Sequence, residues 1–149
     1  MQVVLVEPEI PQNTGSVARL CAATGTRLHL VGHLGFSLED RYLKRAGLDY
    51  WPLVELHVHP DWASFLAAAR PARLLGFSSH GADSYTALRY APGDALVFGG
   101  ESKGLPAELR RRLEPLYRIP IREPRVRSLN LANAVSIVLY EGLRQLGHC

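Results

Sequence analysis

Short apolar runs along the chain alternate with stretches in which apolar residues recur at helical spacing. Val3 to Val6 form a continuous apolar run, which is the pattern of a strand covered on both faces. Further strands are predicted at residues 27–31, 53–58, 74–78, 95–99 and 117–121, and a polar connection at 79–92. Helices are predicted at residues 16–24, 37–46, 61–69 and 106–113, with a last helix that ends at Gly147. This alternation predicts an α/β fold in which a parallel sheet carries helices on both faces, within a single domain of residues 1–149.

Polar residues and glycines mark the expected ends of these helices. Asn13 or Thr14 can cap the first helix, because two prolines are expected to hold residues 7–15 in a loop. Gly25 and Gly47 are expected to end the first and second helices. The later caps are Ser37, Asp61, and either Ser128 or Asn130.

The last helix has apolar residues on two sides. One side carries Leu131, Ala134, Val135 and Val138, and the other carries Ala132, Leu139, Leu143 and Leu146. A single contact surface would leave one of these sides exposed. Two explanations stay open: the helix lies between the sheet and a neighbouring helix, or its second side packs on a partner subunit.

Composition permits a nucleic-acid partner and gives no sign of a membrane protein. The 149 residues are 47% hydrophobic and carry a formal net charge of +3. The basic excess lies in one stretch, which contains Arg110, Arg111, Arg112, Arg118, Arg122, Arg125 and Arg127. No apolar run approaches the roughly 20 residues of a membrane helix, no basic leader is visible, and the two cysteines match no redox spacing, so a cytoplasmic protein is expected. The six histidines form no metal-ligand spacing, so no metal is expected.

Three segments with unusual residues follow predicted strands, at residues 7–13, 99–106 and 122–130. Ligands of parallel α/β sheets bind beyond the carboxyl ends of the strands, so these segments are expected to meet. The glycines in residues 99–106 let backbone groups approach a ligand, although a simple strand-to-helix turn is the better explanation if this motif is taken alone. The first strand is followed by a proline-rich loop and not by Gly-x-Gly-x-x-Gly, which argues against a dinucleotide-binding dehydrogenase.

The segment Arg-Ser-Leu-Asn-Leu-Ala-Asn-Ala-Val at residues 127–135 resembles the third motif of the SPOUT class of RNA methyltransferases. Residues 7–19 and 99–106 resemble two further motifs of the branch that methylates ribose 2′-hydroxyls of tRNA. Together the matches span nearly the whole chain. The resemblance implies a C-terminal trefoil knot, which periodicity could not have predicted because knots are rare.

The resemblance also implies a cofactor, S-adenosylmethionine, bound in a bent conformation inside the knot. The positions that match its binding residues are Phe77, Gly99, Gly104, Ile119, Ser128 and Leu131. Apolar walls suit an adenine ring, and main-chain groups can read its edge. Without the resemblance, Phe77, Ile119 and Leu131 would be interpreted as ordinary core.

The residues that match the family's catalytic positions are Arg19, Asn13, Glu101, Ser128 and Asn130. A guanidinium has a pKa above about 12 and is a poor base, so we expect Arg19 to position the substrate phosphate and stabilise the developing alkoxide. The chain departs from the family pattern at Gly100, where a proline is common, and at Arg125-Val126, where Asp-Ser is common.

With 149 residues, the chain resembles the minimal members of the family. Those members methylate the 2′-hydroxyl of the tRNA wobble nucleotide, a cytidine or a modified uridine. The resemblance therefore implies a tRNA substrate and a homodimer with the first and last helices at its interface. Two alternatives are a methyltransferase that acts on another tRNA or ribosomal RNA position, and a non-catalytic RNA-binding protein of the same fold.

Overall fold

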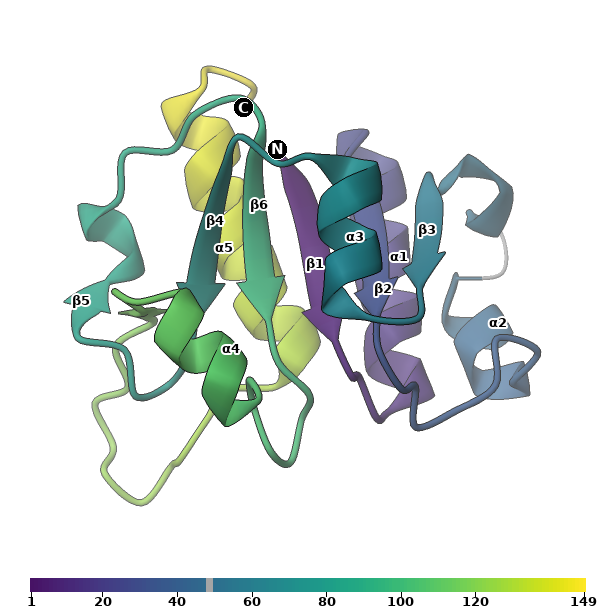
Figure 1. Ribbon diagram of the computed structural model, residues 1–149, viewed down its shortest axis with the longest axis horizontal. Helices are drawn as coiled ribbons and strands as arrows, with labels where there is room; N and C mark the ends of the chain where they lie inside the picture. Colours follow the sequence, from purple (N-terminus) through teal and green to yellow (C-terminus); the bar gives the residue numbers. More distant parts are fainter. Residues whose placement is uncertain (48–49) are drawn as a thin grey trace.

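One sheet of seven strands forms the centre of the computed structural model, which describes residues 1–47 and 50–149 (Figure 1). Its strands are β1 (Gln2–Val6), β2 (Arg27–Val31), β3 (Leu56–His59), β4 (Arg73–Phe77), β5 (Asp83–Ser84), β6 (Asp94–Phe98) and β7 (Tyr117–Arg118). Their order in the sheet is β3-β2-β1-β6-β4-β7-β5, and all the pairs are parallel. Val3 pairs with Leu28 on one side and with Leu96 on the other, so the apolar run of β1 lies in the middle of the sheet.

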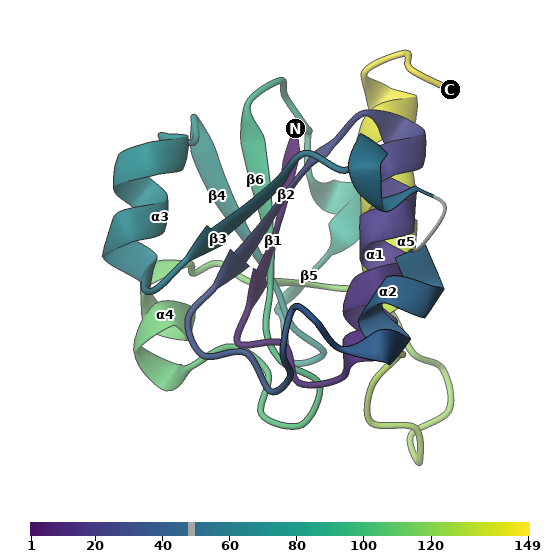
Figure 2. The ribbon, with the colours of Figure 1, turned by 90° about the vertical axis from the view of Figure 1, so that its right-hand side faces the viewer.

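Helices cover both faces of this sheet, as Figure 2 shows in a view along its edge. The helices α1 (Pro11–Thr24) and α5 (Leu131–Gln145) lie on one face, with α2 (Arg41–Gly47) packed outside α1. The helices α3 (Trp62–Ala69) and α4 (Ala107–Arg112) lie on the opposite face. Two short 3₁₀ helices, η1 (Trp51–Leu53) and η2 (Tyr85–Ala87), lie in the connections. The predicted parallel α/β architecture is therefore confirmed.

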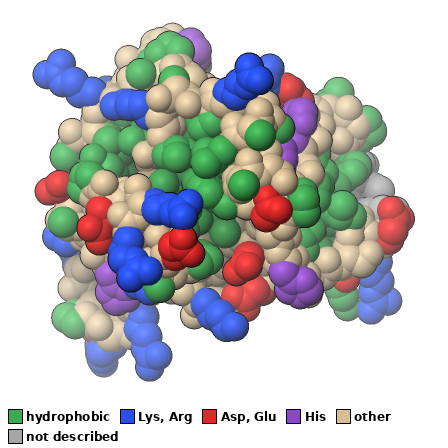
Figure 3. Space-filling view, viewed as in Figure 1, with side chains coloured by type: hydrophobic (Ala, Val, Ile, Leu, Met, Phe, Trp, Pro, Cys, Tyr) green, Lys and Arg blue, Asp and Glu red, His purple; other side chains and the backbone are tan. Residues whose placement is uncertain are grey.

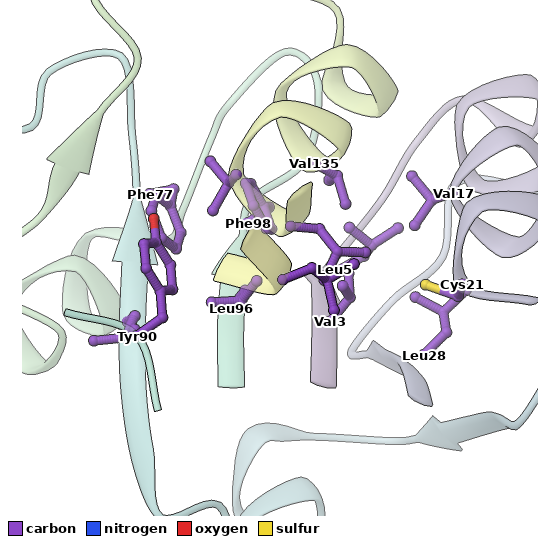
Figure 4. Packing of buried hydrophobic residues seen from close by; sticks show 14 of the residues in the cluster. Val3, Leu5, Val17, Cys21, Leu28, Phe77, Tyr90, Leu96, Phe98 and Val135 are labelled. Carbon is purple, nitrogen blue, oxygen red and sulfur yellow. The ribbon is translucent and has the colours of Figure 1, made fainter. Parts of the chain in front are cut away.

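Two hydrophobic cores lie on the two faces of the sheet. The larger core joins β1, β4 and β6 to α1 and α5, and Figure 4 shows Leu5 and Phe98 packed beside Val17 and Val135. The smaller core joins the other face of β1 and β6 to α3 and α4 through Phe65, which is fully buried. Because β1 contributes to both cores, its five residues are all buried, as its continuous apolar run predicts.

Both apolar sides of α5 pack within its own chain. Val135 and Val138 are buried, and so are Leu139 and Leu143 on the second side, all within the core of the same chain. The intramolecular explanation is therefore correct for these residues. A different and smaller apolar surface of α5 remains exposed, at Ile137 and Tyr140.

The prediction for the start of the first helix is wrong. The helix α1 begins at Pro11, which occupies its first turn, where the missing N–H of a proline costs nothing. Ile10 occupies the N-cap and makes no side-chain capping bond, so neither Asn13 nor Thr14 caps this helix. Gly25 ends it in the left-handed conformation, as predicted.

The first helix thus begins earlier than predicted, whereas the second begins later, at Arg41. Asp40 supplies the cap in place of Ser37, because its Oδ1 accepts hydrogen bonds from the backbone N–H groups of Tyr42 (2.7 Å) and Leu43 (3.3 Å). Helix α2 includes Gly47, and residues 48–49, where the predicted stop would take effect, lie outside the described part of the chain.

Two predicted strands are shorter than expected because proline interrupts them. Pro52 lies in η1, so β3 begins only at Leu56 and not at residue 53. Pro120 has no N–H to donate to a ladder, and β7 ends at Arg118 and not at residue 121. Strand β5, inside the predicted polar connection, was missed because it has only two residues.

The remaining helix ends agree with the sequence. Asp61 caps α3, since its Oδ1 accepts a hydrogen bond from the N–H of Ser64 at 2.7 Å. Asn130, and not Ser128, caps α5. Within the described residues no helix is long and apolar enough to cross a membrane. The order of the strands does not by itself establish the trefoil knot, which stays a prediction.

Candidate active site

The loops that follow β1, β4, β6 and β7 surround a cavity of about 930 Å³ at the carboxyl ends of the strands. All six predicted cofactor residues line it: Phe77, Gly99, Gly104, Ile119, Ser128 and Leu131. Four of the five predicted catalytic residues line it as well: Ser128, which belongs to both sets, and Asn13, Glu101 and Asn130. The arrangement therefore brings together residues that lie as much as 118 positions apart, from Asn13 to Leu131.

The apolar wall of the cavity is built from the ends of β4 and β6. The rings of Phe77 and Phe98 stack with centroids 5.0 Å apart and an interplanar angle of 15°. Phe77 is 7% exposed, so it belongs to the larger core and to the cavity wall at once. The core interpretation and the cofactor interpretation of Phe77 are thus compatible, because a flat apolar wall needs a rigid support.

Backbone crowding explains the glycines of the loop after β6. A Cβ atom on Gly99 would lie 2.1 Å from the carbonyl carbon of Gly104, which no side chain could tolerate. Gly104 has a φ of 65° and donates its N–H to the carbonyl oxygen of Gly100 at 2.9 Å. The loop is thus a tight turn that exposes main-chain groups to the cavity. A Cβ on Gly100 would lie 2.5 Å from the carbonyl oxygen of Glu7, so the small residue at this departure from the family pattern sits against the β1 loop.

Glu101 joins the loop after β6 to the start of α1. Its carboxylate accepts hydrogen bonds from the backbone N–H of Glu9 at 2.7 Å and of Ile10 at 3.1 Å. These N–H groups precede a helix that has no side-chain cap of its own. Glu101 therefore acts as a remote cap for α1, supplied by a loop about 90 residues away.

A reciprocal contact runs in the opposite direction between the same two loops. The Glu9 carboxylate accepts hydrogen bonds from the Ser102 hydroxyl at 2.7 Å and from the Ser102 N–H at 3.1 Å. These hydrogen bonds lower the pKa of Glu9 below its ordinary value. Each loop thus holds the other through a carboxylate, which fixes the wall of the cavity.

Asn13 extends this contact to the third motif. Its Nδ2 donates to Glu101 Oε1 at 3.2 Å, and its Oδ1 accepts from Asn130 Nδ2 at 2.9 Å. Asn130 Oδ1 in turn accepts the N–H of Asn133 and so caps α5. A continuous chain of hydrogen bonds therefore links all three motifs, from the β6 loop through α1 to the start of α5.

The loop between β7 and α5 closes the cavity with basic and polar residues. Ser128 and Arg127 are exposed and line it, and Arg110 of α4 lines it from the other side. Figure 3 shows Lys and Arg side chains over α4 and over the loop below it. Arg112 and Arg125 are paired with Glu108 and Glu123, and both arginines remain largely exposed. This side of the cavity offers arginine donors to an anionic ligand.

Arg19 lies outside the cavity of a single chain. It occupies an exposed position of α1, on the same stripe as Gln12, Ser16 and Ala23. Its guanidinium lies over the ring of Tyr50, with Cζ 4.8 Å from the ring centroid. The structure thus brings together every predicted site residue except the one to which the resemblance assigns the central catalytic role.

The cavity also contains residues that the sequence analysis missed, namely Ser78, Ser79 and His80 after β4. Ser78 was predicted to end the strand at residues 74–78, and Ser79 and His80 to begin the polar connection at 79–92. The rule that ligands bind beyond the carboxyl ends of parallel strands applies to β4 as well and could have included them. Among the described residues no group of three or more His, Cys, Asp or Glu side chains is placed to hold a metal ion.

Comparison with known proteins identifies the family. Residues 1–140 match the SpoU rRNA Methylase family. This chain belongs to that family. The match covers all three motifs, so the resemblance to RNA methyltransferases predicted from them is confirmed.

Curated relatives of this SpoU family member are similar over nearly their whole length. A tRNA (cytidine(34)-2′-O)-methyltransferase from Burkholderia ambifaria is 50% identical, and the match covers 97% of this chain and 95% of the relative. The protein of that same name from Escherichia coli K12 is 47% identical, with 99% of this chain and 95% of the relative covered.

Solved structures agree with these relatives. One, described as giving structural insights into the 2-OH methylation of C/U34 on tRNA, has a TM-score of 0.94 and 52% identity over 99% of this chain and 97% of its own. The SpoU methyltransferase AviRb from Streptomyces viridochromogenes, in complex with the cofactor AdoMet, has a TM-score of 0.86 and 26% identity over 100% of this chain and 61% of its own. The family fold is therefore the fold of this SpoU protein.

Proposed function

We propose that this SpoU family protein is an S-adenosylmethionine-dependent tRNA methyltransferase that modifies the ribose 2′-hydroxyl of the wobble nucleotide, a cytidine or a modified uridine. One observation carries the proposal: a single cavity gathers all three motifs in a chain about half identical, end to end, to enzymes named for this reaction. The full-length similarity favours the wobble position over another tRNA or ribosomal RNA site.

The cavity suits S-adenosylmethionine in size and in chemistry. Its volume of about 930 Å³ lies within the range of small-molecule and cofactor sites. Phe77, Ile119 and Leu131 offer apolar walls for an adenine ring, and the crowded glycines of residues 99–104 leave main-chain groups free to bind its edge. When bound, S-adenosylmethionine supplies a methyl group on a positively charged sulfur, which is reactive toward an oxygen nucleophile.

The residues of the chain have three tasks in this reaction. The β6 loop and the loop before α5 exclude water and fix the direction of approach, since methyl transfer needs in-line geometry. Asn13 and Asn130 are held rigidly at the cavity by their mutual hydrogen bond, and Ser128 lies beside them, where the ribose would enter. Arg19 binds the substrate phosphate and stabilises the alkoxide as the 2′-hydroxyl loses its proton to solvent water.

The basic residues around the cavity are proposed to bind the tRNA backbone. Arg110 and Arg127 line the cavity, while Arg111, Arg122 and Arg125 extend the exposed basic surface around it. Arginine binds phosphate through two parallel N–H donors, and such contacts position an RNA without reading its sequence. The pairing of Arg125 with Glu123 leaves it largely exposed, so an RNA phosphate can compete for it.

We propose that the protein acts as a homodimer, because Arg19 cannot reach the cavity of its own chain. The outer surfaces of α1 and α5 lie side by side on one face of the molecule (Figure 2). That surface carries Arg19 together with the exposed apolar side chains of Ile10, Ile137 and Tyr140. Packing two copies through this surface would cover the apolar residues and carry Arg19 toward the cavity of the partner.

Transfer of labelled methyl from S-adenosylmethionine to total tRNA tests the proposal, with tRNA from a strain that lacks this protein. Nucleoside analysis and mapping are expected to locate the label as a 2′-O-methylated pyrimidine at the wobble position. Label at another position would retain the reaction but replace the substrate. Absence of transfer, with no heat of cofactor binding in calorimetry, would favour a non-catalytic RNA-binding protein.

A further inference from the structure

We propose that Tyr50 is a positioning residue for Arg19, and that it orients the guanidinium while leaving every N–H donor free. This inference rests on the catalytic role proposed for Arg19. The Arg19 Cζ lies 4.8 Å from the centroid of the Tyr50 ring, which is the geometry of a cation–π contact. Tyr50 is 37% exposed, so most of its ring is covered in spite of its place at the surface.

The lack of any other partner of Arg19 supports this role. Within the described residues, Arg19 makes no ion pair and no hydrogen bond, and its guanidinium contacts only the ring of Tyr50. Most arginines that are held in place here are held by carboxylates: Arg27 by Glu55, Arg73 by Asp94, Arg112 by Glu108, Arg125 by Glu123 and Arg144 by Glu141.

A carboxylate would hold Arg19 more strongly but would prevent it from binding the substrate. It would occupy the planar fork of donors and cancel the positive charge that an RNA phosphate or a developing alkoxide requires. A stacked ring contacts only the flat face of the guanidinium, so the donors at its edge stay available. The aromatic contact thus restricts the orientation of the arginine without competing with the substrate.

The backbone around Tyr50 is built to present its ring firmly. Tyr50 is the N-cap residue of η1, and its carbonyl oxygen accepts the N–H of Leu53 at 2.8 Å. The next residue, Trp51, packs against the larger core, and Val54 donates its N–H to the Trp51 carbonyl oxygen at 3.1 Å. The ring therefore projects from an anchored turn toward the exposed stripe of α1.

A cation–π contact at an exposed site corresponds to about a two- to five-fold preference for the held orientation. Loss of the ring should therefore lower kcat for tRNA by about two- to five-fold. It should leave the Kd for S-adenosylmethionine unchanged, because Tyr50 does not line the cavity. A residue that merely supported the fold would change the Tm and this Kd together.

The experiment compares three variants of the 149-residue chain in steady-state assays with saturating tRNA. Tyr50→Leu removes the π face and keeps apolar bulk, so kcat should fall; Tyr50→Phe keeps the ring and should restore it. The matched control is Tyr42→Leu, because Tyr42 is 41% exposed and lies under Arg41 with the same 4.8 Å separation, yet Arg41 has no proposed role in the reaction. That control should keep the kcat of the unaltered protein.

A double-mutant cycle separates action through Arg19 from any other effect. Arg19→Lys lowers kcat by removing the planar fork, and adding Tyr50→Leu to it should cause no further loss, because an ammonium has no plane to orient. Equal losses in both backgrounds, or full kcat in Tyr50→Leu, would overturn the inference while the proposed function stood. Failure of the unaltered protein to methylate tRNA would instead overturn the proposed function.

Discussion

His29 shows how a single polar residue is accommodated in the middle of the sheet. It is 3% exposed, and its Nε2 lies 2.8 Å from Gln2 Oε1, which can only accept, so this nitrogen carries the proton. Its Nδ1 is then an acceptor and receives the N–H of His59 Nε2 at 2.9 Å. Burial first, and then the charges of the neighbouring His57, His59 and Arg27, lower the pKa of His29 to about 4, so its ring is neutral in the folded protein at neutral pH. Burial also lowers the pKa of His59.

Stability should therefore decrease on mild acidification. The folded pKa of His29 lies below the unfolded value of about 6.5, so the unfolded state binds more protons and the stability present above pH 6.5 is lost as the pH falls toward about 4. We expect the free energy of unfolding to be about 2 kcal/mol lower at about pH 5 than at about pH 7.5, measured by denaturant titration at one protein concentration.

The control for this prediction is chosen by exposure. His29→Gln should remove most of the pH dependence between about pH 7 and pH 5, whereas His33→Gln, at an exposed histidine, should preserve it. The carboxylates with lowered pKa values, such as Glu9 and Glu55, lose their contribution only at lower pH. An unchanged slope in His29→Gln would show that other groups cause the acid sensitivity.

At the scale of elements, the beginning of α1 depends on a loop from another part of the chain. The Glu101 carboxylate binds the N–H groups that precede the helix, and the Glu9–Ser102 contact fastens the two loops from the other side. Asn13, in the first turn of the same helix, accepts a hydrogen bond from Asn130 and so connects these loops to the start of α5. One network thus fixes the wall of the cavity together with Asn13 and Asn130, the two asparagines proposed to act in catalysis.

Glu101→Gln should therefore weaken stability and catalysis together. The amide retains one acceptor but turns donors toward N–H groups, so we expect a loss of about 1–3 kcal/mol in the free energy of unfolding and a lower kcat. Hydrogen exchange should accelerate at the amides of Glu9 and Ile10. Glu108→Gln breaks only an exposed i,i+4 pair with Arg112 and should cost under about 0.5 kcal/mol. Equal effects of the two substitutions would contradict the capping role.

At the scale of the whole molecule, the position of Arg19 is the reason for the proposed homodimer. The cavity opens beside the loop between β7 and α5, which carries Arg122, Arg125 and Arg127. Arg19 lies instead on the outer face of α1, next to the apolar side chains of α5. A single chain therefore separates the proposed catalytic arginine from the proposed cofactor site. Assembly through α1 and α5 would bring the two together.

A charge in the proposed interface should dissociate the dimer and abolish most of the activity. Ile137→Glu places a carboxylate on the exposed apolar surface of α5, where it would be buried without a partner charge in the dimer. Sedimentation should show a monomer that still binds S-adenosylmethionine. Val58→Glu is the control, because Val58 is 47% exposed on β3 at the far edge of the sheet. This variant should remain dimeric and active. Full activity in a monomeric variant would eliminate the dimer from the mechanism.

Local chemistry made several features predictable from the residues themselves. The apolar run at Val3 to Val6, the Asp61 cap and the stop at Gly25 depend on neighbours in sequence, and the structure confirms each of them. The convergence of the three motifs was also predictable, because parallel strands place their carboxyl ends at one edge of a sheet.

Long-range contacts were decided only by the tertiary structure. The sequence contains no sign that Glu101 caps α1, so Asn13 or Thr14 was the predicted cap and the predicted start of the helix was too late. Nor does it indicate that Arg19 lies outside the cavity and under the ring of Tyr50. The sequence by itself determined which elements form and which residues meet at the ends of the strands. Which side chains satisfy one another across the fold depended on packing, because those partners are close in space and far apart along the chain.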